Sequence, residues 1–277
     1  MRKTLLQIEI LYNDLGRGEQ RIADWILKNP TGLIPLSITQ LANLVGCGEA
    51  TVYRFAKRLG FEGYQELKIS LAKEENDGIP QGNITENDSM KNIFHKVSDD
   101  IYRSLEKTEK TVSYRSLTDA AERIMQSRLI LVFGLGNSAS VATDTAHKLL
   151  RIGLNAAAFS DNHMQAIAAA HLSDADTVIG VSHSGSSVDI VEAMKIAKSK
   201  GAFTIAITDC GRSPIDKYSD LKLATAADET NYSILALNSR IAQLAIIDAL
   251  YFYIIYRMPG AKNAIEETER ALLNKKY

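Results

Sequence analysis

The sequence predicts an α/β protein in which a small all-α domain precedes a doubly wound parallel sheet with helices on both faces. Three observations support this fold class. The chain has 277 residues, 45% of them hydrophobic, which is room for about two domains. The pattern of residues 1 to about 73 predicts short helices with clear start and stop signals. From Arg128 onward, short apolar runs alternate with segments of helical length, as in βαβ units.

Helix boundaries are clear in the N-terminal segment. The apolar residues between Ile22 and Leu27 share one helical face, and Pro30 ends that helix because proline disfavours α geometry in the residue before it. Ser37 and Gln40 have the spacing of a capping box and predict the start of the next helix.

A polar linker separates the two predicted domains. From Glu74 to about Asp88 the sequence is polar, acidic and contains Gly, Pro and Asn, so it cannot bury enough surface to pack alone. Apolar residues repeat at i,i+4 from Ile93 to Leu105 and predict a connecting helix. We therefore expect a helix-turn-helix domain, a linker with its connecting helix, and an α/β/α domain over residues 1–77, 78–110 and 111–277.

Five apolar runs are the predicted strands, at residues 129–133, 155–159, 177–181, 203–207 and 221–224. Runs that are apolar on both faces suit a parallel sheet, and right-handed crossovers then give a doubly wound sandwich. Ligands in such folds bind beyond the carboxyl ends of the strands.

Charge, cysteine and histidine content exclude several classes of protein. The 32 basic and 33 acidic residues give a net charge of −1, which excludes global charge attraction to nucleic acid. Cys47 and Cys210 are far apart, which excludes a disulfide framework and fits a reducing compartment. The histidines and carboxylates lack H-E-x-x-H spacing, so no metal is expected. No apolar run approaches the ~18 residues of a membrane span, so we expect a cytoplasmic protein with no membrane partner.

Residues 38–60 have the pattern of a helix-turn-helix. Small Ala42 lets the two helices approach, and Gly46 suits the left-handed geometry of the turn. The remaining template positions are expected to be buried and are occupied by Leu41, Val45, Cys47, Val52 and Phe55.

The second helix of this motif carries a local basic stripe. Residues 48–59 hold three basic residues against one acid, whereas residues 1–77 hold ten of each sign. Because the start of a recognition helix points into the major groove, the candidates for base-edge contacts are Glu49, Ala50, Tyr53 and Arg54. The candidates for phosphate contacts are Lys57, Arg58 and Lys68. The alternative is an ordinary solvated helix face.

Two loops rich in serine and glycine follow predicted strands, and each opens a helix. The first contains Gly136, Asn137 and Ser138, and the second contains Ser182, His183, Ser184 and Ser187. A helix N-terminus with hydroxyls beside it can bind a phosphate monoester without lysine or arginine. Each serine could instead be a structural N-cap. The first loop lacks the third glycine and the acidic residue of a dinucleotide site, and no P-loop is present, so a small phosphorylated ligand and no cofactor are expected.

The chain resembles the RpiR family of bacterial transcription regulators, which combine a helix-turn-helix domain with a sugar isomerase (SIS) domain. The resemblance covers nearly the whole chain and is carried by residues 21–30 and 50–64, by Ser182-His183-Ser184-Gly185, and by Thr208-Asp209 with Ser213-Pro214. It implies a homodimer that binds a palindromic double-stranded DNA operator and responds to a phosphosugar. It also implies that Ser138, Ser182, Ser184 and Ser187 hold the phosphate, with His183 between the serines.

Two positions depart from the family pattern. Ser187 stands where threonine is usual and keeps the hydroxyl. Gly48 stands where a serine commonly caps the recognition helix, so the helix keeps an adequate cap and loses one phosphate contact.

A phosphosugar isomerase with an accessory helical domain is the alternative function. His163 and Glu229 follow predicted strands and could act as a base, or could bind sugar hydroxyls or an N-acyl group. Arg54, Lys57 and Arg58 favour a regulator, because an isomerase has no reason to place them on one helix after a turn. We therefore expect no catalytic residue and a repressor of a carbohydrate or amino-sugar operon, such as one for sialic acid or N-acetylmannosamine. The leading effectors are N-acetylmannosamine 6-phosphate and N-acetylglucosamine 6-phosphate.

Overall fold

The computed structural model describes residues 3–30, 32–75, 84–227 and 237–275. The chain forms two compact units, of which the first consists mainly of Met1–Asp100 and the second of Ile101–Cys210, Pro214–Ala227 and Asn238–Tyr277. The boundary between the units falls inside a single helix, α6 (Met90–Thr111). The domain limits expected at residues 77 and 110 stay predictions.

The first unit is a set of short helices around one apolar core, to which Ile22, Leu41, Val52 and Phe55 contribute fully buried side chains. Its elements are α1 (Lys3–Leu11), the 3-10 turn η1 (Tyr12–Asp14), α2 (Arg17–Lys28), α3 (Ile38–Val45), α4 (Glu49–Arg58) and α5 (Tyr64–Glu75).

The predicted helix boundaries in this unit are confirmed. Asn29, directly before Pro30, caps the end of α2. At the start of α3, Ser37 Oγ accepts a hydrogen bond from Gln40 N, and Ser37 N donates to Gln40 Oε1 at 2.6 Å. This is the reciprocal capping box that the sequence predicts.

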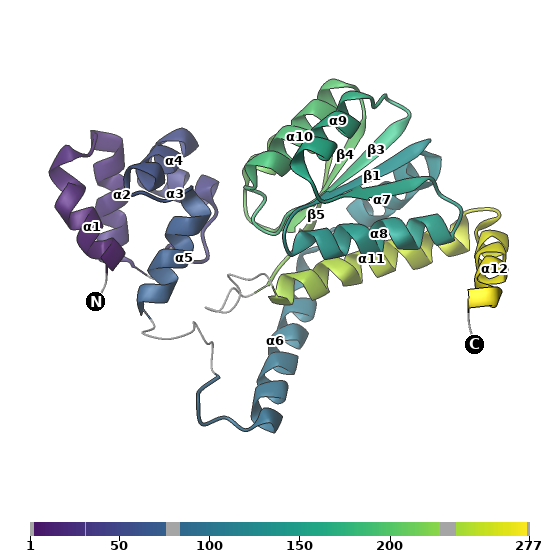
Figure 1. Cartoon of the computed structure of the whole chain (residues 1–277), viewed down its shortest axis with the longest axis horizontal. Helices are drawn as coiled ribbons and strands as arrows, with labels where there is room; N and C mark the ends of the chain where they lie inside the picture. Colours follow the sequence, from purple (N-terminus) through teal and green to yellow (C-terminus); the bar gives the residue numbers. More distant parts are fainter. Residues whose placement is uncertain (1–2, 31, 76–83, 228–236, 276–277) are drawn as a thin grey trace. The chain divides into compact units, whose positions relative to one another are not determined.

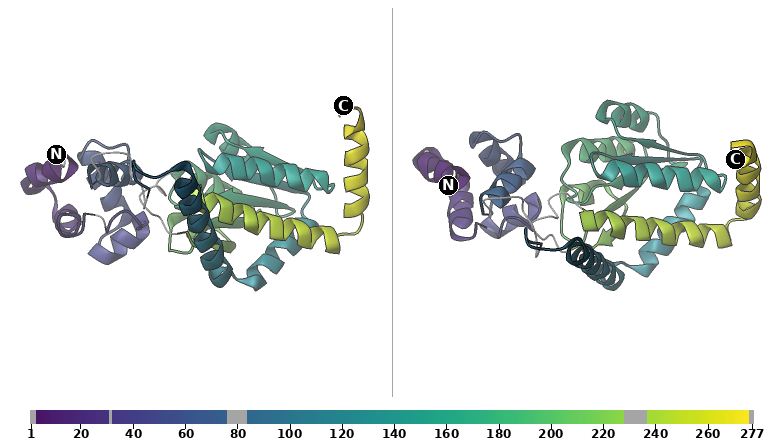
Figure 2. Two further views of the ribbon diagram at one scale, coloured as in Figure 1. Left: turned by 90° about the horizontal axis from the view of Figure 1, so that it is seen from below. Right: turned by 60° about the horizontal axis from the view of Figure 1, so that its bottom comes forward.

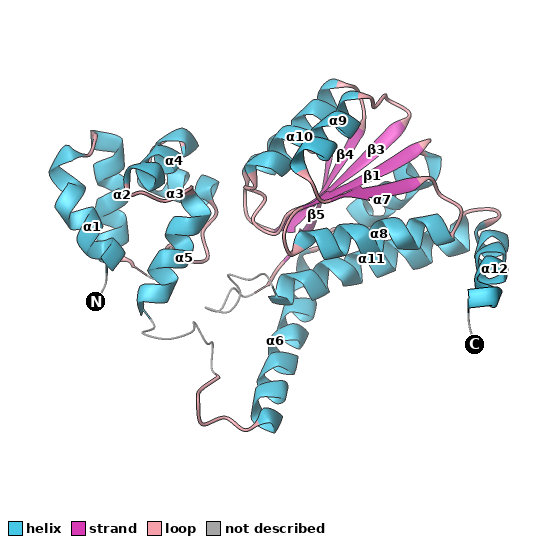
Figure 3. Cartoon of the chain, in the orientation of Figure 1, coloured by secondary structure: helices cyan, strands magenta, loops and turns pink. Residues whose placement is uncertain are grey.

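The second unit is a five-stranded parallel sheet flanked by helices (Figure 1 and Figure 3). After α6 the elements are α7 (Tyr114–Gln126), β1 (Leu129–Gly134), α8 (Ser138–Arg151), β2 (Ala156–Phe159), α9 (Asn162–Ala170), β3 (Asp176–Val181), α10 (Val188–Ser199), β4 (Phe203–Asp209), η2 (Pro214–Tyr218), β5 (Leu221–Thr225), α11 (Leu237–Arg257), α12 (Ala261–Leu272) and η4 (Leu273–Lys275).

The strands lie in the order β2-β1-β3-β4-β5, and all neighbouring pairs are parallel. Each strand ends within two residues of its predicted limits, so the predicted doubly wound sheet is confirmed.

Helices cover both faces of the sheet because alternate strand residues point to opposite sides. On one face, Ile130 and Val132 of β1 pack with α7, α8 and α11. On the other face, Leu131 and Phe133 pack with α9 and α10. The two views of Figure 2 keep α8 and α11 side by side, and an ion pair between Lys148 and Asp248 joins them.

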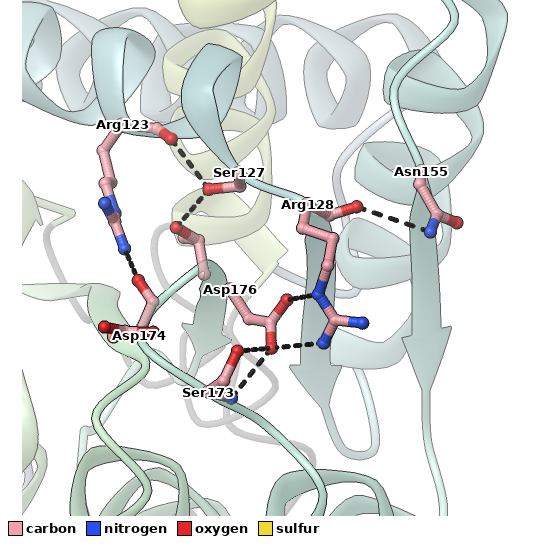
Figure 4. A network of polar contacts seen from close by, with 8 residues as sticks. Arg123, Ser127, Arg128, Asn155, Ser173, Asp174 and Asp176 are labelled. Atoms are coloured by element: carbon pink, nitrogen blue, oxygen red, sulfur yellow. Dashed lines mark hydrogen bonds and ion pairs between the residues drawn. The ribbon is translucent and has the colours of Figure 1, made fainter.

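A network of polar contacts ties the amino ends of β1 and β3 together (Figure 4). Arg128 donates to both carboxylate oxygens of Asp176, at 3.0 and 2.8 Å. The Asp176 side chain is fully buried and also accepts hydrogen bonds from the backbone and hydroxyl of Ser173. Burial opposes ionisation of Asp176, but these donors outweigh it, so the pKa of Asp176 lies below its usual range.

Helix α11 is long and apolar. By length and composition, residues 238–257 would suffice to cross a membrane. The core helix of a water-soluble domain passes the same test, and Ile246, Ile247, Leu250 and Ile254 of α11 are buried against the sheet. The expectation that no run approaches a membrane span was therefore wrong for this segment; 39% of it is buried, so burial accounts for part of its composition.

Candidate functional site

The two serine-bearing loops leave neighbouring strands at the same edge of the sheet. Gly134, the last residue of β1, is in register with Val181, the last residue of β3. The strand order reverses direction between β1 and β3, because the chain crosses to β2 on one side and to β4 on the other. In doubly wound sheets this switch point is where ligands bind.

The first loop turns sharply from β1 into α8. Gly136 has a φ of 53°, in the left-handed region that favours glycine. At Gly134 an added Cβ would lie 2.5 Å from the carbonyl oxygen of Ser138, so the loop folds back closely on the strand end. Ser138 is the first residue of α8, and its side chain is half-buried.

The second loop is held by backbone contacts to β4. Ser182 N donates to Ile207 O at 3.1 Å, and the carbonyl of His183 accepts from Asp209 N and from Thr208 Oγ1. These contacts keep the loop beside the end of β4, while Gly185, with a φ of 59°, allows the turn toward α10.

Neither loop uses its N-cap side chain to cap the helix that follows. Asn137 occupies the N-cap position of α8 and Ser187 that of α10, and neither side chain makes a capping hydrogen bond. Two serines of the second loop, Ser184 and Ser187, are half-buried. The first backbone N–H groups of these two helices, together with the hydroxyls, are therefore suited to an anion.

His163 comes from a third loop at the same edge of the sheet. It is exposed in the first turn of α9, which follows β2, and Asp161 Oδ1 caps that helix by accepting from Met164 N. Asn162 Nδ2 donates to Asp189 Oδ1 at 3.2 Å, which links the first turns of α9 and α10. The residue before His163 thus contacts the helix that follows the second loop, whereas Glu229 lies outside the described residues.

The helix-turn-helix of the first unit has the predicted turn. Gly46 adopts φ 66° and ψ 45°, and Cys47 N donates to Ala42 O at 2.8 Å. Leu41, Val52 and Phe55 are fully buried, as expected. Val45 and Cys47 are only half-buried, because they pack at the margin of the core.

One side of α4 is exposed and basic. Ala50, Tyr53 and Arg54 lie on this face with Lys57 and Arg58. A surface hollow of about 500 Å³ adjoins it, and its lining residues are Gly16, Gly18, Glu19, Thr51, Arg54, Lys57 and Arg58. The sequence analysis did not predict that Gly16, Gly18 and Glu19 line this hollow. The Gly-Arg-Gly run at the start of α2 was the sequence feature that could have indicated it.

Two of these cations already have carboxylate partners. Lys57 Nζ lies 3.3 Å from Glu62 Oε2, and this hydrogen bond raises the pKa of Lys57. Arg58 Nη1 lies 3.5 Å from the largely buried carboxylate of Glu19 and donates to Asp14 O at 2.6 Å. Both side chains keep close to half of their surface exposed.

Two of the predicted DNA-contacting residues have structural surroundings instead. Lys68 is only 5% exposed and donates to Leu36 O at 3.0 Å, so the expected phosphate contact of Lys68 is contradicted by its burial. Glu49 is half-buried and accepts a hydrogen bond from Thr39 Oγ1 at 2.8 Å, which joins α3 to α4. The burial of Lys68 could not be predicted from the sequence pattern. A lysine can bury its long aliphatic stem when its amine donates a hydrogen bond to a backbone carbonyl.

Among the described residues, no group of three or more His, Cys, Asp or Glu side chains could hold a metal ion.

Comparison with known proteins relates both units to regulators. Residues 2–78 match the helix-turn-helix domain of the rpiR family, and residues 123–253 match the SIS domain. An uncharacterised HTH-type transcriptional regulator from Caldanaerobacter subterraneus is 35% identical over 258 residues, covering 92% of this chain and 91% of that protein. The regulator HexR of Pseudomonas aeruginosa is 33% identical over 253 residues, covering 90% and 88%.

A solved structure is similar over the whole length. The NanR protein of Vibrio vulnificus, complexed with ManNAc-6P, is 26% identical with a TM-score of 0.83, and the match covers 99% of both chains. Together with the sequence relatives, this shows that the chain belongs to the RpiR family of HTH-type transcriptional regulators, with an N-terminal helix-turn-helix domain and a C-terminal SIS domain.

Proposed function

We propose that this regulator represses a carbohydrate or amino-sugar catabolic operon and that a phosphosugar bound to its SIS domain releases the operator. The observation that carries the proposal is the pair of serine loops at the switch point of the sheet, whose N-cap side chains do not cap their helices. A purely structural N-cap would use its side chain for the helix.

The phosphate is proposed to bind between the two loops. Hydrogen bonds to the phosphate would come from the hydroxyls of Ser138, Ser182, Ser184 and Ser187. Gly136 has no side chain and would let the phosphate approach the backbone closely. The sugar would contact Asn137, His163, His183 and Glu229. The NanR structure, which contains ManNAc-6P, supports N-acetylmannosamine 6-phosphate as the first effector to test, with N-acetylglucosamine 6-phosphate as the second.

Double-stranded DNA is proposed to bind the exposed face of α4. Arg54, with Ala50 and Tyr53, would contact base edges, while Lys57 and Arg58 would contact phosphates. Arg54→Ala should then lose sequence discrimination, because base contacts and not phosphate contacts carry the sequence information.

We propose that the SIS domain binds its sugar without converting it. The homologues are transcriptional regulators, and the exposed basic face of α4 suits DNA binding, for which an isomerase has no need. Incubation of the protein with each phosphosugar, followed by sugar analysis, tests this point. An aldose–ketose conversion that depends on His163 would overturn it in favour of an isomerase.

The first experiment is a thermal-shift series with hexose and amino-sugar 6-phosphates beside their unphosphorylated parents, because a specific ligand stabilises the folded state by mass action. A shift by one phosphosugar and not by its parent is the expected result. The same compound should release operator DNA in a fluorescence-anisotropy titration. If no phosphosugar shifts the melting temperature, the proposed effector site is wrong.

A further inference from the structure

One buried amide lies just behind the proposed effector site. Gln165 is in α9, two residues after His163, and its side chain is fully buried. Its Nε2 donates to the carbonyl of Phe159 at 2.8 Å and approaches the carbonyl of Gly134 at 3.5 Å. A single side chain thus bridges three elements.

The two carbonyls belong to the ends of neighbouring strands. Phe159 is the last residue of β2, and Gly134 is the last residue of β1 and the first of the loop that leads to Ser138. Gln165 therefore connects the helix that carries His163 to the start of the first serine loop. A change in the position of α9 would be transmitted to that loop through this amide.

The orientation of the Gln165 amide follows from its partners. Carbonyls only accept hydrogen bonds, so the NH₂ group must face Phe159 and Gly134, and Oε1 must point elsewhere. There Oε1 is buried and accepts no hydrogen bond from the described part of the chain. A buried acceptor without a donor destabilises the folded state. The useful part of this side chain is therefore its donor group, and the shape of the residue could be supplied by methionine at no such cost.

We infer that Gln165 is a positioning residue of the effector site, which sets the separation between His163 and the first serine loop by holding the ends of β1 and β2. The inference rests on the proposed function, since it concerns the response to the same phosphosugar. Gln165 itself touches neither the sugar nor the DNA.

The test is Gln165→Met, which keeps the length of the side chain and removes its hydrogen bonds. Thr204→Val is the matched control: Thr204 is also fully buried, and its hydroxyl donates to Asp220 at 2.8 Å at the opposite edge of the sheet. Both variants and the wild type are titrated with N-acetylmannosamine 6-phosphate and N-acetylglucosamine 6-phosphate in thermal-shift assays, and with operator DNA by anisotropy without sugar.

For Gln165→Met we expect the half-saturating sugar concentration to rise roughly tenfold, because a positioning hydrogen bond is lost. The affinity for operator DNA should stay unchanged. Thr204→Val should respond to sugar like the wild type. A merely structural role would lower the melting temperature of both variants and leave the sugar concentration dependence alone, and that result would overturn the inference.

Gln165→Asn is a second variant, to be used if the Gln165→Met protein does not fold. Its shorter side chain keeps an amide but should lose the longer contact, to Gly134, and show a smaller change in the same direction. If the wild type itself responds to neither sugar, the proposed function fails, whereas a responsive wild type with an equally responsive Gln165→Met disproves only the role of Gln165.

Discussion

The serine hydroxyls at the switch point are neutral donors, and their proposed role makes a specific prediction. Ser138→Ala combined with Ser184→Ala removes one donor from each loop, so the response to phosphosugar should disappear while operator affinity stays near that of the wild type. Thermal shift and DNA anisotropy on the same sample measure both properties. Ser199→Ala is the control, because the Ser199 hydroxyl donates to Ile196 O within the last turn of α10, at the end away from the second loop. Full induction of the double variant would exclude the serine loops from effector binding.

In the proposed DNA complex, Glu62 would compete with DNA phosphate for Lys57. Their ion pair is exposed, with 43% and 91% of the two side chains accessible, so it contributes little to stability and DNA phosphate can replace the carboxylate. Glu62→Gln should therefore strengthen binding to all DNA sequences, by about severalfold at low salt. Lys57→Ala should weaken binding to all sequences and reduce the salt slope by about 1.

The control for Glu62→Gln is Glu106→Gln. Glu106 forms a similar exposed ion pair with Lys110 on α6. Equal effects of the two substitutions on DNA affinity would show that only net charge matters and that Glu62 has no particular relation to Lys57.

At the scale of elements, the Arg128–Asp176 contact joins β1 to β3 and should be a main determinant of the stability of the sheet. Asp176→Asn keeps the shape and leaves Arg128 without its carboxylate partner. Because Asp176 is fully buried and held by four hydrogen bonds, the free energy of unfolding at pH 7 should fall by about 2 kcal/mol or more. Urea unfolding of the wild type and of Asp176→Asn measures this difference in the free energy of unfolding.

The same substitution predicts a pH dependence. The pKa of Asp176 is lower in the folded chain than in the unfolded chain, so its contribution is complete above the unfolded value of about 3.9 and is lost as the pH falls through the lower folded value. The difference between wild type and Asp176→Asn should therefore be constant from pH 7 to about pH 5 and shrink below about pH 4. A difference that grows on acidification would contradict this account.

Elements and contacts differ in how well they can be predicted from the sequence. The strands were predictable because each is a largely apolar run, and the pattern is local; in β3 (Asp176–Val181) every residue is buried. The same holds for the turn at Gly46 and the cap at Ser37. The pairing of Arg128 with Asp176, 48 residues away, was not predictable, because nothing local marks either residue.

The candidate site shows the same division. The serine loops were found because each follows a strand directly, whereas Gln165 is followed by an apolar stretch of its helix and belongs to no motif. Its contribution becomes visible only when β1 and β2 are seen to end side by side. The phosphate contact predicted for Lys68 rested on the general expectation that a lysine is exposed. Lys68 is instead buried, donates to Leu36 O and lies over the ring of Tyr64.

For the whole molecule, the proposal requires that effector and operator influence each other's binding. In a homodimer, two recognition helices enter major grooves about 34 Å apart. A coupling of roughly 1–3 kcal/mol would change operator affinity about 5–150-fold. By linkage, operator DNA must weaken the affinity for the phosphosugar by the same factor. Isothermal titration of sugar into the protein, with and without operator DNA, checks this equality. A sugar affinity that does not change when DNA is bound would show that the two sites are independent.

Helix α11 has a consequence for the synthesis of the chain. It supplies Ile246, Ile247, Leu250 and Ile254 to the face of the sheet that β1, β3 and β4 also share, yet it follows every strand in the sequence. While the ribosome adds residues at about 5–20 per second, the α2–α5 core can close early, since all of it precedes residue 76. The sheet, by contrast, has one apolar face that only α7 and α8 cover until residue 254 has emerged. Truncation of the nascent chain before α11 should therefore leave a species that binds chaperones and aggregates, even though all five strands are present.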